Sequence, residues 1–261
     1  MCYFGPPTGR LFGVFDEPAT GGASEVGVVL CYPHGPDYAT AFRSFRILGT
    51  RFGRAGFHVL RFDYLGTGDS SGDVEDASIP QWIADVVTAI HELRTSRELR
   101  EVSLIGLRLG ATLAALAAAE CQRVDRLVLW EPVIDGREYV ATQRALHRAW
   151  VDEEVRDGRK MLSADDELLG YRLTDRLRRD LENVSLWSLA KVPAPYIYVL
   201  SQRPSREYER LAEQLRAKGA RVDTNCVDGP KIWSRTPSMD EAFVPNGAMQ
   251  AIVTWLAGAS R

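Results

Sequence analysis

The segment at residues 102–113 constrains this chain more than any other, because it predicts a strand, a tight turn and a helix in immediate succession. An apolar run ends in Gly106-Leu107-Arg108-Leu109-Gly110, and an Ala- and Leu-rich stretch follows. In a strand–turn–helix of this kind, the sequence Gly-x-Ser-x-Gly holds a nucleophilic serine at the turn. Here the central residue is Arg108, and a guanidinium stays protonated and cannot attack a carbonyl carbon. The segment therefore predicts the architecture of a nucleophile elbow without its usual chemistry.

Most of the chain alternates between short apolar runs rich in β-branched residues and longer helical patterns. This alternation predicts βαβ units, and therefore an α/β protein with a doubly wound, mostly parallel sheet. An N-terminal hairpin is expected at residues 4–17. We expect strands at residues 26–32, 57–64, 101–106, 126–130, 196–200 and 221–227, and helices at 41–55, 80–95, 109–121, 206–218 and 248–257.

The pattern changes between residues 136 and 190, which are rich in charged residues and are predicted to be helical and free of strands. We interpret this segment, 136–190, as a helical cap inserted into a core formed by residues 1–135 and 191–261. A chain of 261 residues is long enough for one sizeable core and one small insertion. Aromatic residues of the cap, among them Tyr171, could contact an organic ligand or could pack the cap onto the core.

Charge and composition exclude several classes of partner. The formal net charge is −3 and no basic arm occurs, so neither nucleic acid nor an anionic membrane is an expected partner. Residues 1–7 lack the charged and apolar regions of a signal peptide, and the most apolar helical stretch is too short to span a bilayer. We therefore expect a cytoplasmic protein.

The cysteines and glycines suggest neither a metal nor a cofactor. The four cysteines show no CxxC spacing, and we interpret them as free, mostly buried thiols, Cys31 included. No dinucleotide-binding fingerprint follows the first strand. The sequence therefore predicts a site that works without metal or cofactor.

Several stretches together resemble the serine-aminopeptidase-like (S33-type) α/β-hydrolases, including the hydrolases associated with the exosortase A system. They are Pro33-His34-Gly35-Pro36-Asp37-Tyr38, residues 57–70 with Arg-Phe-Asp-Tyr-Leu-Gly-Thr-Gly-Asp-Ser, residues 106–111, and Trp130-Glu131-Pro132. The resemblance covers essentially the whole chain and implies the α/β-hydrolase fold with a cap. Some members of the exosortase-associated group carry the same arginine, which would make Arg108 a feature of a subgroup.

The resemblance also implies where a Ser–His–Asp triad would lie. The acid would follow the strand at 196–200, where the chain offers no carboxylate before Glu207. The histidine would lie in the loop at 228–236, which contains none and where Trp233 would occupy its place. Of the four histidines in the chain, only His34 falls near the expected site. We therefore do not expect a triad mechanism.

What remains is a predicted anion site. By position, the backbone amides of Leu109 and of His34, which precedes Gly35 in its loop, would form an oxyanion hole at a helix N-terminus. Arg108 would add a cation that either binds a carboxylate, phosphate or enolate-like oxyanion, or is neutralised by Glu131 at the end of the adjacent strand. These alternatives are compatible. His34 could be a general acid–base, or could contribute only its amide.

Three functions stay open at this point. The favoured one is a non-hydrolytic, cofactor-free biosynthetic enzyme that uses Arg108 on a small carbonyl, acyl or carboxylate substrate, or on an acyl carrier thioester. The second is a non-catalytic binding or scaffold protein that has kept only the fold. The third is an ester or thioester hydrolase with unconventional residues. A homodimer is left open.

Overall fold

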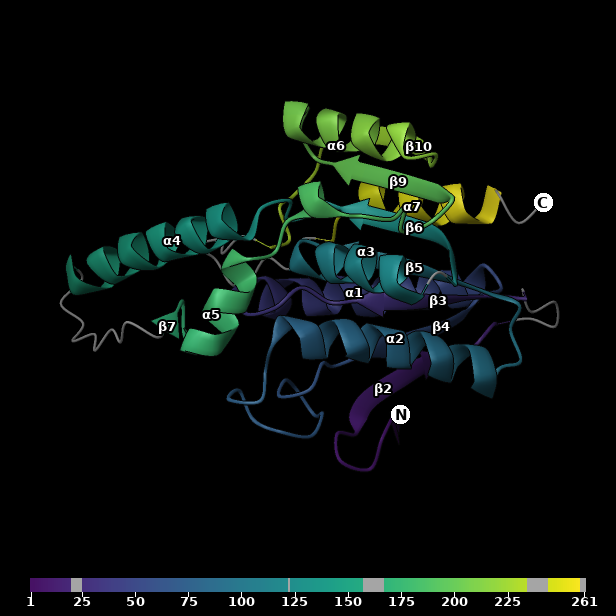
Figure 1. Ribbon diagram of the computed structural model, residues 1–261, viewed down its shortest axis with the longest axis horizontal. Coiled ribbons are helices and arrows are strands. Elements are labelled where there is room, and N and C mark those ends of the chain that lie inside the picture. The colour runs from purple at the N-terminus through teal and green to yellow at the C-terminus, as the bar shows by residue number, and fades with distance from the viewer. Residues whose placement is uncertain (20–24, 122, 157–166, 234–243, 259–261) are drawn as a thin grey trace.

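The computed structural model describes residues 1–19, 25–121, 123–156, 167–233 and 244–258. Its centre is an eight-stranded sheet in the order β1-β2-β4-β3-β5-β6-β9-β10, with helices on both faces (Figure 1). The strands of this sheet are β1 (Cys2–Phe4), β2 (Leu11–Asp16), β3 (Val26–Cys31), β4 (His58–Phe62), β5 (Glu101–Leu107), β6 (Val124–Trp130), β9 (Tyr196–Ser201) and β10 (Arg221–Cys226). The helices around it are α1 (Pro36–Arg54), α2 (Ile79–Ser96), α3 (Leu109–Cys121), α6 (Arg206–Ala217) and α7 (Asn246–Gly258).

The sheet is parallel from β4 to β10, and the hairpin of β1 and β2 joins it antiparallel at one edge. The central strands are apolar on both faces because helices cover both; Val28–Cys31 in β3, for example, are fully buried. On the described residues, α1 contacts α7 and α2 contacts α3. The predicted fold is confirmed: this is an α/β-hydrolase fold.

One helix boundary differs from the prediction in a way that matters for the site. We expected the first long helix at residues 41–55, whereas α1 begins at Pro36. Proline is favoured in the first turn of a helix, and Gly35 before it has a φ of 65° that reverses the chain. The earlier start places Asp37 in the first turn of α1, where its side chain is buried.

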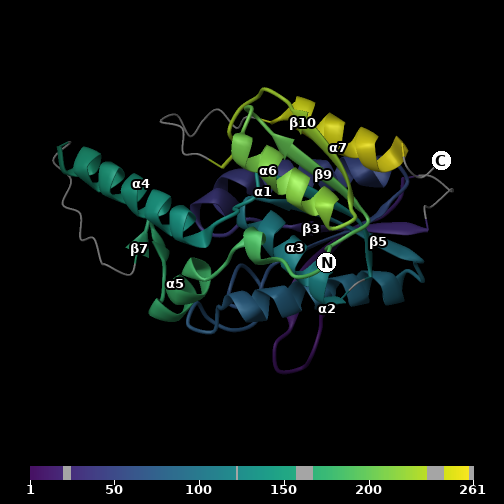
Figure 2. The ribbon, with the colours of Figure 1, turned by 45° about the horizontal axis from the view of Figure 1, so that its top comes forward.

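The segment between β6 and β9 leaves and rejoins the core at one place. Asp135 and Ser185 form an isolated bridge, and the amide of Gly136 donates to the Val184 carbonyl at 2.9 Å. The segment contains α4 (Gly136–Arg156), β7 (Glu167–Leu168), β8 (Tyr171–Arg172), α5 (Asp175–Glu182) and the short helix η1 (Leu186–Ser188). In Figures 1 and 2, α4 and α5 extend from one end of the sheet. The division into core and cap remains a prediction.

The hairpin β7–β8 corrects the prediction that residues 136–190 contain no strand. Its turn is formed by Leu169 and Gly170, with φ of 52° and 89°. Each strand has only two residues, which is too short to show the alternation by which a strand is recognised in sequence. Residues 157–166 of the segment lie outside the described part of the chain.

The elbow is built on two glycines that allow backbone to touch backbone. A Cβ on Gly110 would lie 2.3 Å from the carbonyl oxygens of both Cys31 and Tyr32, and one on Gly106 would lie 2.4 Å from the amide of Ala111. These contacts let α3 start directly after β5 and pack against the end of β3 (Figure 1).

Gly110→Ala should therefore destabilise the protein, because the added Cβ can be accommodated only if the backbone of α3 or of β3 moves. We expect a loss of about 2–3 kcal/mol in the free energy of unfolding, measured by urea denaturation. Gly229→Ala is the matched control, because a Cβ there would meet nothing within 4 Å. Equal stabilities of the two variants would contradict this account of the elbow.

Candidate functional site

The backbone of Arg108 has the strained conformation of an elbow residue. Its φ is 54°, its amide donates to the Trp130 carbonyl at 3.0 Å, and its carbonyl accepts from the Ala111 amide at 3.0 Å. Four non-glycine residues in the described part of the chain have a positive φ, and Glu131, at the end of the neighbouring strand, is another of them. Such conformations cost roughly 1–3 kcal/mol each and gather at functional sites.

The side chain of Arg108 lies between an acid and two aromatic rings. Its Nε lies 3.6 Å from Oδ2 of Asp37, and its Nη1 donates to the Glu131 carbonyl at 3.4 Å. The centroids of the Tyr139 and Trp233 rings are 5.9 and 5.6 Å from the guanidinium carbon. The side chain is 18% exposed, so part of the cation reaches solvent. We call Asp37, Arg108, Tyr139, Gln143 and Trp233 the elbow site.

The expected ion pair between Arg108 and Glu131 is corrected by this geometry, because Asp37 takes its place. The carboxylate of Glu131 accepts instead from the Gln202 amide at 2.6 Å and from the Tyr208 hydroxyl at 3.1 Å. The positive φ of Glu131, 47°, leaves its carbonyl beside Arg108 while its carboxylate lies at the end of β9. A catalytic role for Glu131 remains a prediction, although its side chain is held away from Arg108.

Asp37 is the site residue that the sequence reasoning missed. The signal that could have found it is the pair Pro36-Asp37, a proline at the start of a helix followed by an acid in the first turn. Burial raises the pKa of Asp37 to about 6. The neighbouring Arg108 cation, the Tyr139 hydroxyl, which donates at 3.4 Å, and the Gln143 amide all act to lower that pKa.

His34 and Gly35 form the loop that faces the elbow. Burial lowers the pKa of His34 to about 4, and its ring packs on Trp82 with centroids 4.6 Å apart. A histidine that is neutral at neutral pH fits the interpretation in which it contributes its backbone amide. A Cβ on Gly35 would lie 3.9 Å from Cγ of Tyr171, so the β7–β8 hairpin lies over this loop.

The N-terminus of α3 adds backbone donors at the same place. Leu109 is the first residue of α3, and the first amides of a helix have no partner within the helix. Together with the helix dipole, these amides favour negative charge beside Arg108. The oxyanion hole at Leu109 and His34 stays a prediction that this placement allows.

Two groups near the elbow, the Thr112 hydroxyl and the Cys31 thiol, are engaged or buried. Thr112 donates to the Val133 carbonyl at 2.6 Å, one turn into α3. Cys31 is fully buried, and burial raises the pKa of its thiol far above the usual range. A group in either state is a poor nucleophile at neutral pH.

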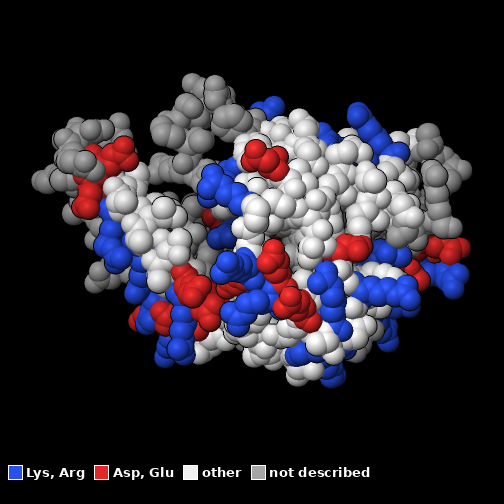
Figure 3. Space-filling model, turned by 90° about the horizontal axis from the view of Figure 1, so that it is seen from above, with Lys and Arg blue, Asp and Glu red and all other residues white. Residues whose placement is uncertain are grey.

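The described residues contain no group of three or more His, Cys, Asp or Glu that could hold a metal ion. Within the same ranges, no helix is long and apolar enough to cross a membrane. On the face shown in Figure 3, acidic and basic side chains are interspersed. Residues 234–236, which belong to the loop predicted at 228–236, lie outside the described part.

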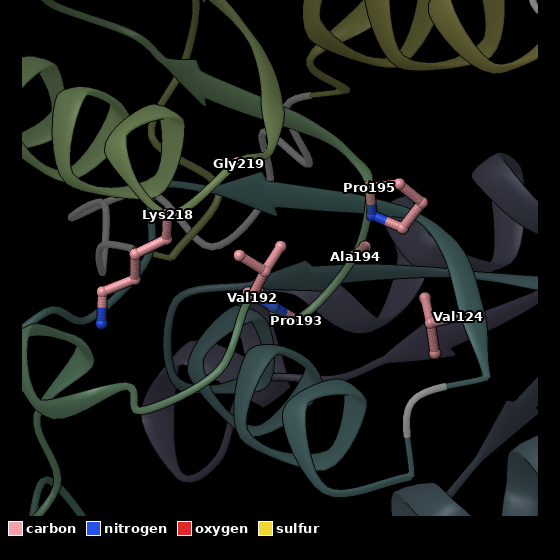
Figure 4. Close-up of a pocket in the computed structure, with 7 residues that line it drawn as sticks. All are labelled: Val124, Val192, Pro193, Ala194, Pro195, Lys218 and Gly219. Carbon is pink, nitrogen blue, oxygen red and sulfur yellow. The ribbon is translucent and has the colours of Figure 1, made fainter.

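A separate pocket of about 300 Å³ lies at the opposite end of the strands (Figure 4). Val124, at the start of β6, and Ala194 and Pro195, just before β9, contribute to its wall. Its one charged side chain is Lys218, whose amine donates to the Leu189 carbonyl. This pocket lacks convergent polar groups, so the elbow is the better candidate for a functional site.

The raised pKa of Asp37 predicts a pH dependence of stability. The folded protein keeps a proton up to about pH 6, whereas the unfolded chain releases it near the ordinary value of 3.8. The stability that this proton contributes is full below pH 3.8 and is lost as the pH rises through 6. Relative to Asp37→Asn, the wild type should therefore lose about 3 kcal/mol over this range, measured by urea denaturation at several pH values.

Asp73→Asn, which changes an exposed acid and leaves Asp37 in place, is the control for this experiment and should keep the pH dependence of the wild type. Parallel stability curves for the wild type and Asp37→Asn would show that Asp37 ionises as it does in the unfolded chain.

Comparison with known proteins agrees with the architecture. Residues 28–193 match the family described as serine aminopeptidase, S33. The mitochondrial palmitoyl-protein thioesterase ABHD10 of Bos taurus is 35% identical over 82 residues, which are 31% of this chain and 26% of that protein. The chain thus matches only about a quarter of the bovine protein's length.

Two solved structures illustrate the likeness of fold. The esterase Est1E of Butyrivibrio proteoclasticus, with ferulic acid bound, has a TM-score of 0.63 at 13% identity and covers 99% of this chain and 97% of its own. Mouse ABHD10 has a TM-score of 0.57 at 18% identity, with 99% and 97% covered. At such identities these likenesses concern the fold alone, whereas the family match includes the elbow itself. The chain belongs to the serine aminopeptidase S33 family of α/β-hydrolases.

Proposed function

We propose that this protein binds a small carbonyl, acyl or carboxylate compound at the elbow site and acts on it without forming a covalent acyl-enzyme. The observation that carries the proposal is the placement of Arg108. An arginine occupies the strained elbow position, lies beside two aromatic rings, and still keeps 18% of its side chain exposed. In a Gly-x-Ser-x-Gly elbow the residue at this position attacks the substrate, whereas Arg108 would bind the negative charge of the substrate.

Two sources of positive potential converge on the same point. The guanidinium supplies a full charge with planar donors suited to a carboxylate, and the N-terminus of α3 supplies backbone amides and a dipole. A carbonyl placed there would be polarised, and an enolate or tetrahedral oxyanion derived from it would be stabilised. This arrangement supports proton transfer or elimination next to a carbonyl, chemistry that needs neither a nucleophilic side chain nor a cofactor.

Hydrolysis of an ester or thioester is the second candidate. Membership of the serine aminopeptidase family favours it, as does the similarity to a protein named as a palmitoyl-protein thioesterase. With Arg108 at the elbow, water would attack the carbonyl directly. Arg108 and the α3 amides would stabilise the same oxyanion, and an acyl carrier thioester would be a fitting substrate.

Arg108→Ser tests the anchoring role, since serine is the residue that such a turn accommodates. Butyrate, phenylacetate and an acyl thioester should each raise the melting temperature of the wild type and leave that of Arg108→Ser unchanged. Calorimetry should give a loss of roughly 100-fold in affinity, because the variant removes a charged hydrogen-bonding partner. Arg148→Ser, which removes an exposed arginine of α4, is the charge-matched control and should bind as the wild type does.

Turnover separates the two candidates. We expect no labelling by a fluorophosphonate and no burst with p-nitrophenyl butyrate, because no acyl-enzyme forms. Binding of the thioester without release of thiol supports non-hydrolytic chemistry, whereas release of thiol that disappears in Arg108→Ser supports hydrolysis. Undiminished binding in Arg108→Ser, or neither binding nor turnover in the wild type, would overturn the proposal and indicate a scaffold protein.

A further inference from the structure

Buried polar atoms without a hydrogen-bond partner gather around the elbow. In the described part of the chain, five buried side-chain atoms lack such a partner. Four of them belong to Arg108, Trp130, Gln143 and Gln202. The first, second and fourth of these residues lie at the carboxyl ends of β5, β6 and β9, and Gln143 lies in α4. Because folded proteins satisfy nearly all buried polar groups, such a cluster points to a polar ligand.

Two of these atoms are a donor and an acceptor on side chains that contact the same carboxylate, Asp37. Nε of Arg108 is a donor that lies 3.6 Å from Asp37, beyond a good hydrogen bond. Oε1 of Gln143 is an acceptor, and the amide of this side chain faces Asp37. Gln143 is only 5% exposed, so bulk solvent does not compensate its oxygen.

The ligand group that fits this pair must accept one hydrogen bond and donate another. A hydroxyl does both, and it is as small as the water molecule that polar cavities commonly hold. A methylene in its place would leave both protein atoms unpaired, at a cost for each buried group. We infer that the elbow site selects hydroxylated carboxylates or hydroxyacyl compounds, whose hydroxyl accepts from Arg108 Nε and donates to Gln143 Oε1.

This inference rests on the proposed function, because the carboxylate or carbonyl of the same ligand would bind the exposed part of Arg108. It adds the substrate class and assigns selectivity to Gln143, a residue of the segment between β6 and β9. Selection of this kind is strong where a buried polar site must be filled, since the analogue without the hydroxyl leaves that site unsatisfied.

Matched pairs of acids test the inference. Each enantiomer of mandelate is compared with phenylacetate, and each enantiomer of lactate with propionate, by calorimetry on the whole protein at pH 7.5. We expect one enantiomer of the hydroxy acid to bind about tenfold more tightly than its deoxy partner, as one hydrogen bond to a charged group predicts. The Arg108 Nε–H resonance should shift when mandelate is added and should not shift when phenylacetate is added, which would report the same contact.

Gln143→Leu should abolish this preference, since it removes the acceptor and fills similar volume. Thr142→Val, at an exposed neighbour on α4, is the control and should keep the preference. Unfolding curves of each variant show whether the fold is intact, and Gln143→Met serves if the leucine variant does not fold.

The outcomes distinguish the hydroxyl site from the anchoring role of Arg108. Equal binding of hydroxy and deoxy acids by the wild type, or an unchanged preference in Gln143→Leu, overturns the hydroxyl site and leaves the anchoring role of Arg108 standing. Absence of binding by all of these acids overturns both.

Discussion

The close approach of α3 to the ends of β3 and β5 is the constraint on which the site depends. Gly110 lies against the carbonyl oxygens of Cys31 and Tyr32, and Gly106 lies against the start of the helix. With backbone on both sides, the residue between them is held at a positive φ whatever its side chain is. The packing around the elbow thus maintains the strained backbone conformation of Arg108, and such strain persists in proteins only where the surrounding structure enforces it. The elbow has therefore kept its shape although its central residue cannot be a nucleophile.

A cation held at this point then determines what must surround it. Arg108 lies beside the positive end of a helix, which by itself disfavours a positive charge. Asp37 supplies the compensating charge, and its own burial raises its pKa to about 6. Tyr139 and Trp233 lie beside the guanidinium and offer their rings to it. Arg108 is thus neutralised in part by Asp37 and shielded in part by the two rings, and 18% of its side chain remains exposed.

This arrangement also explains how one fold can support different chemistry. The amides at the start of α3 belong to the backbone and survive any change of side chain at the elbow. A serine at the elbow position could attack a substrate as a nucleophile. An arginine at that position instead adds its positive charge to the potential that the amides create. The elbow thus combines backbone amides at the start of a helix with a cation at the elbow position.

The sequence predicted the parts of the structure that depend on local pattern. The strands, the helices and the elbow follow from runs of buried residues and from two glycines, because periodicity and close packing leave direct marks in a sequence. The hairpin β7–β8 was missed because two-residue strands carry no such pattern. The start of α1 was misplaced because a proline that opens a helix was assigned to the preceding loop.

By itself the sequence determined the fold family and the identity of the residue at the elbow. Only the tertiary structure decided which acid compensates Arg108. Glu131 and Asp37 both lie near the carboxyl edge of the sheet. The positive φ of Glu131 leaves its carboxylate with Gln202 and Tyr208, while the first turn of α1 brings Asp37 to Arg108. Charge pairing is decided by side-chain direction in three dimensions, and spacing along the chain does not encode that direction.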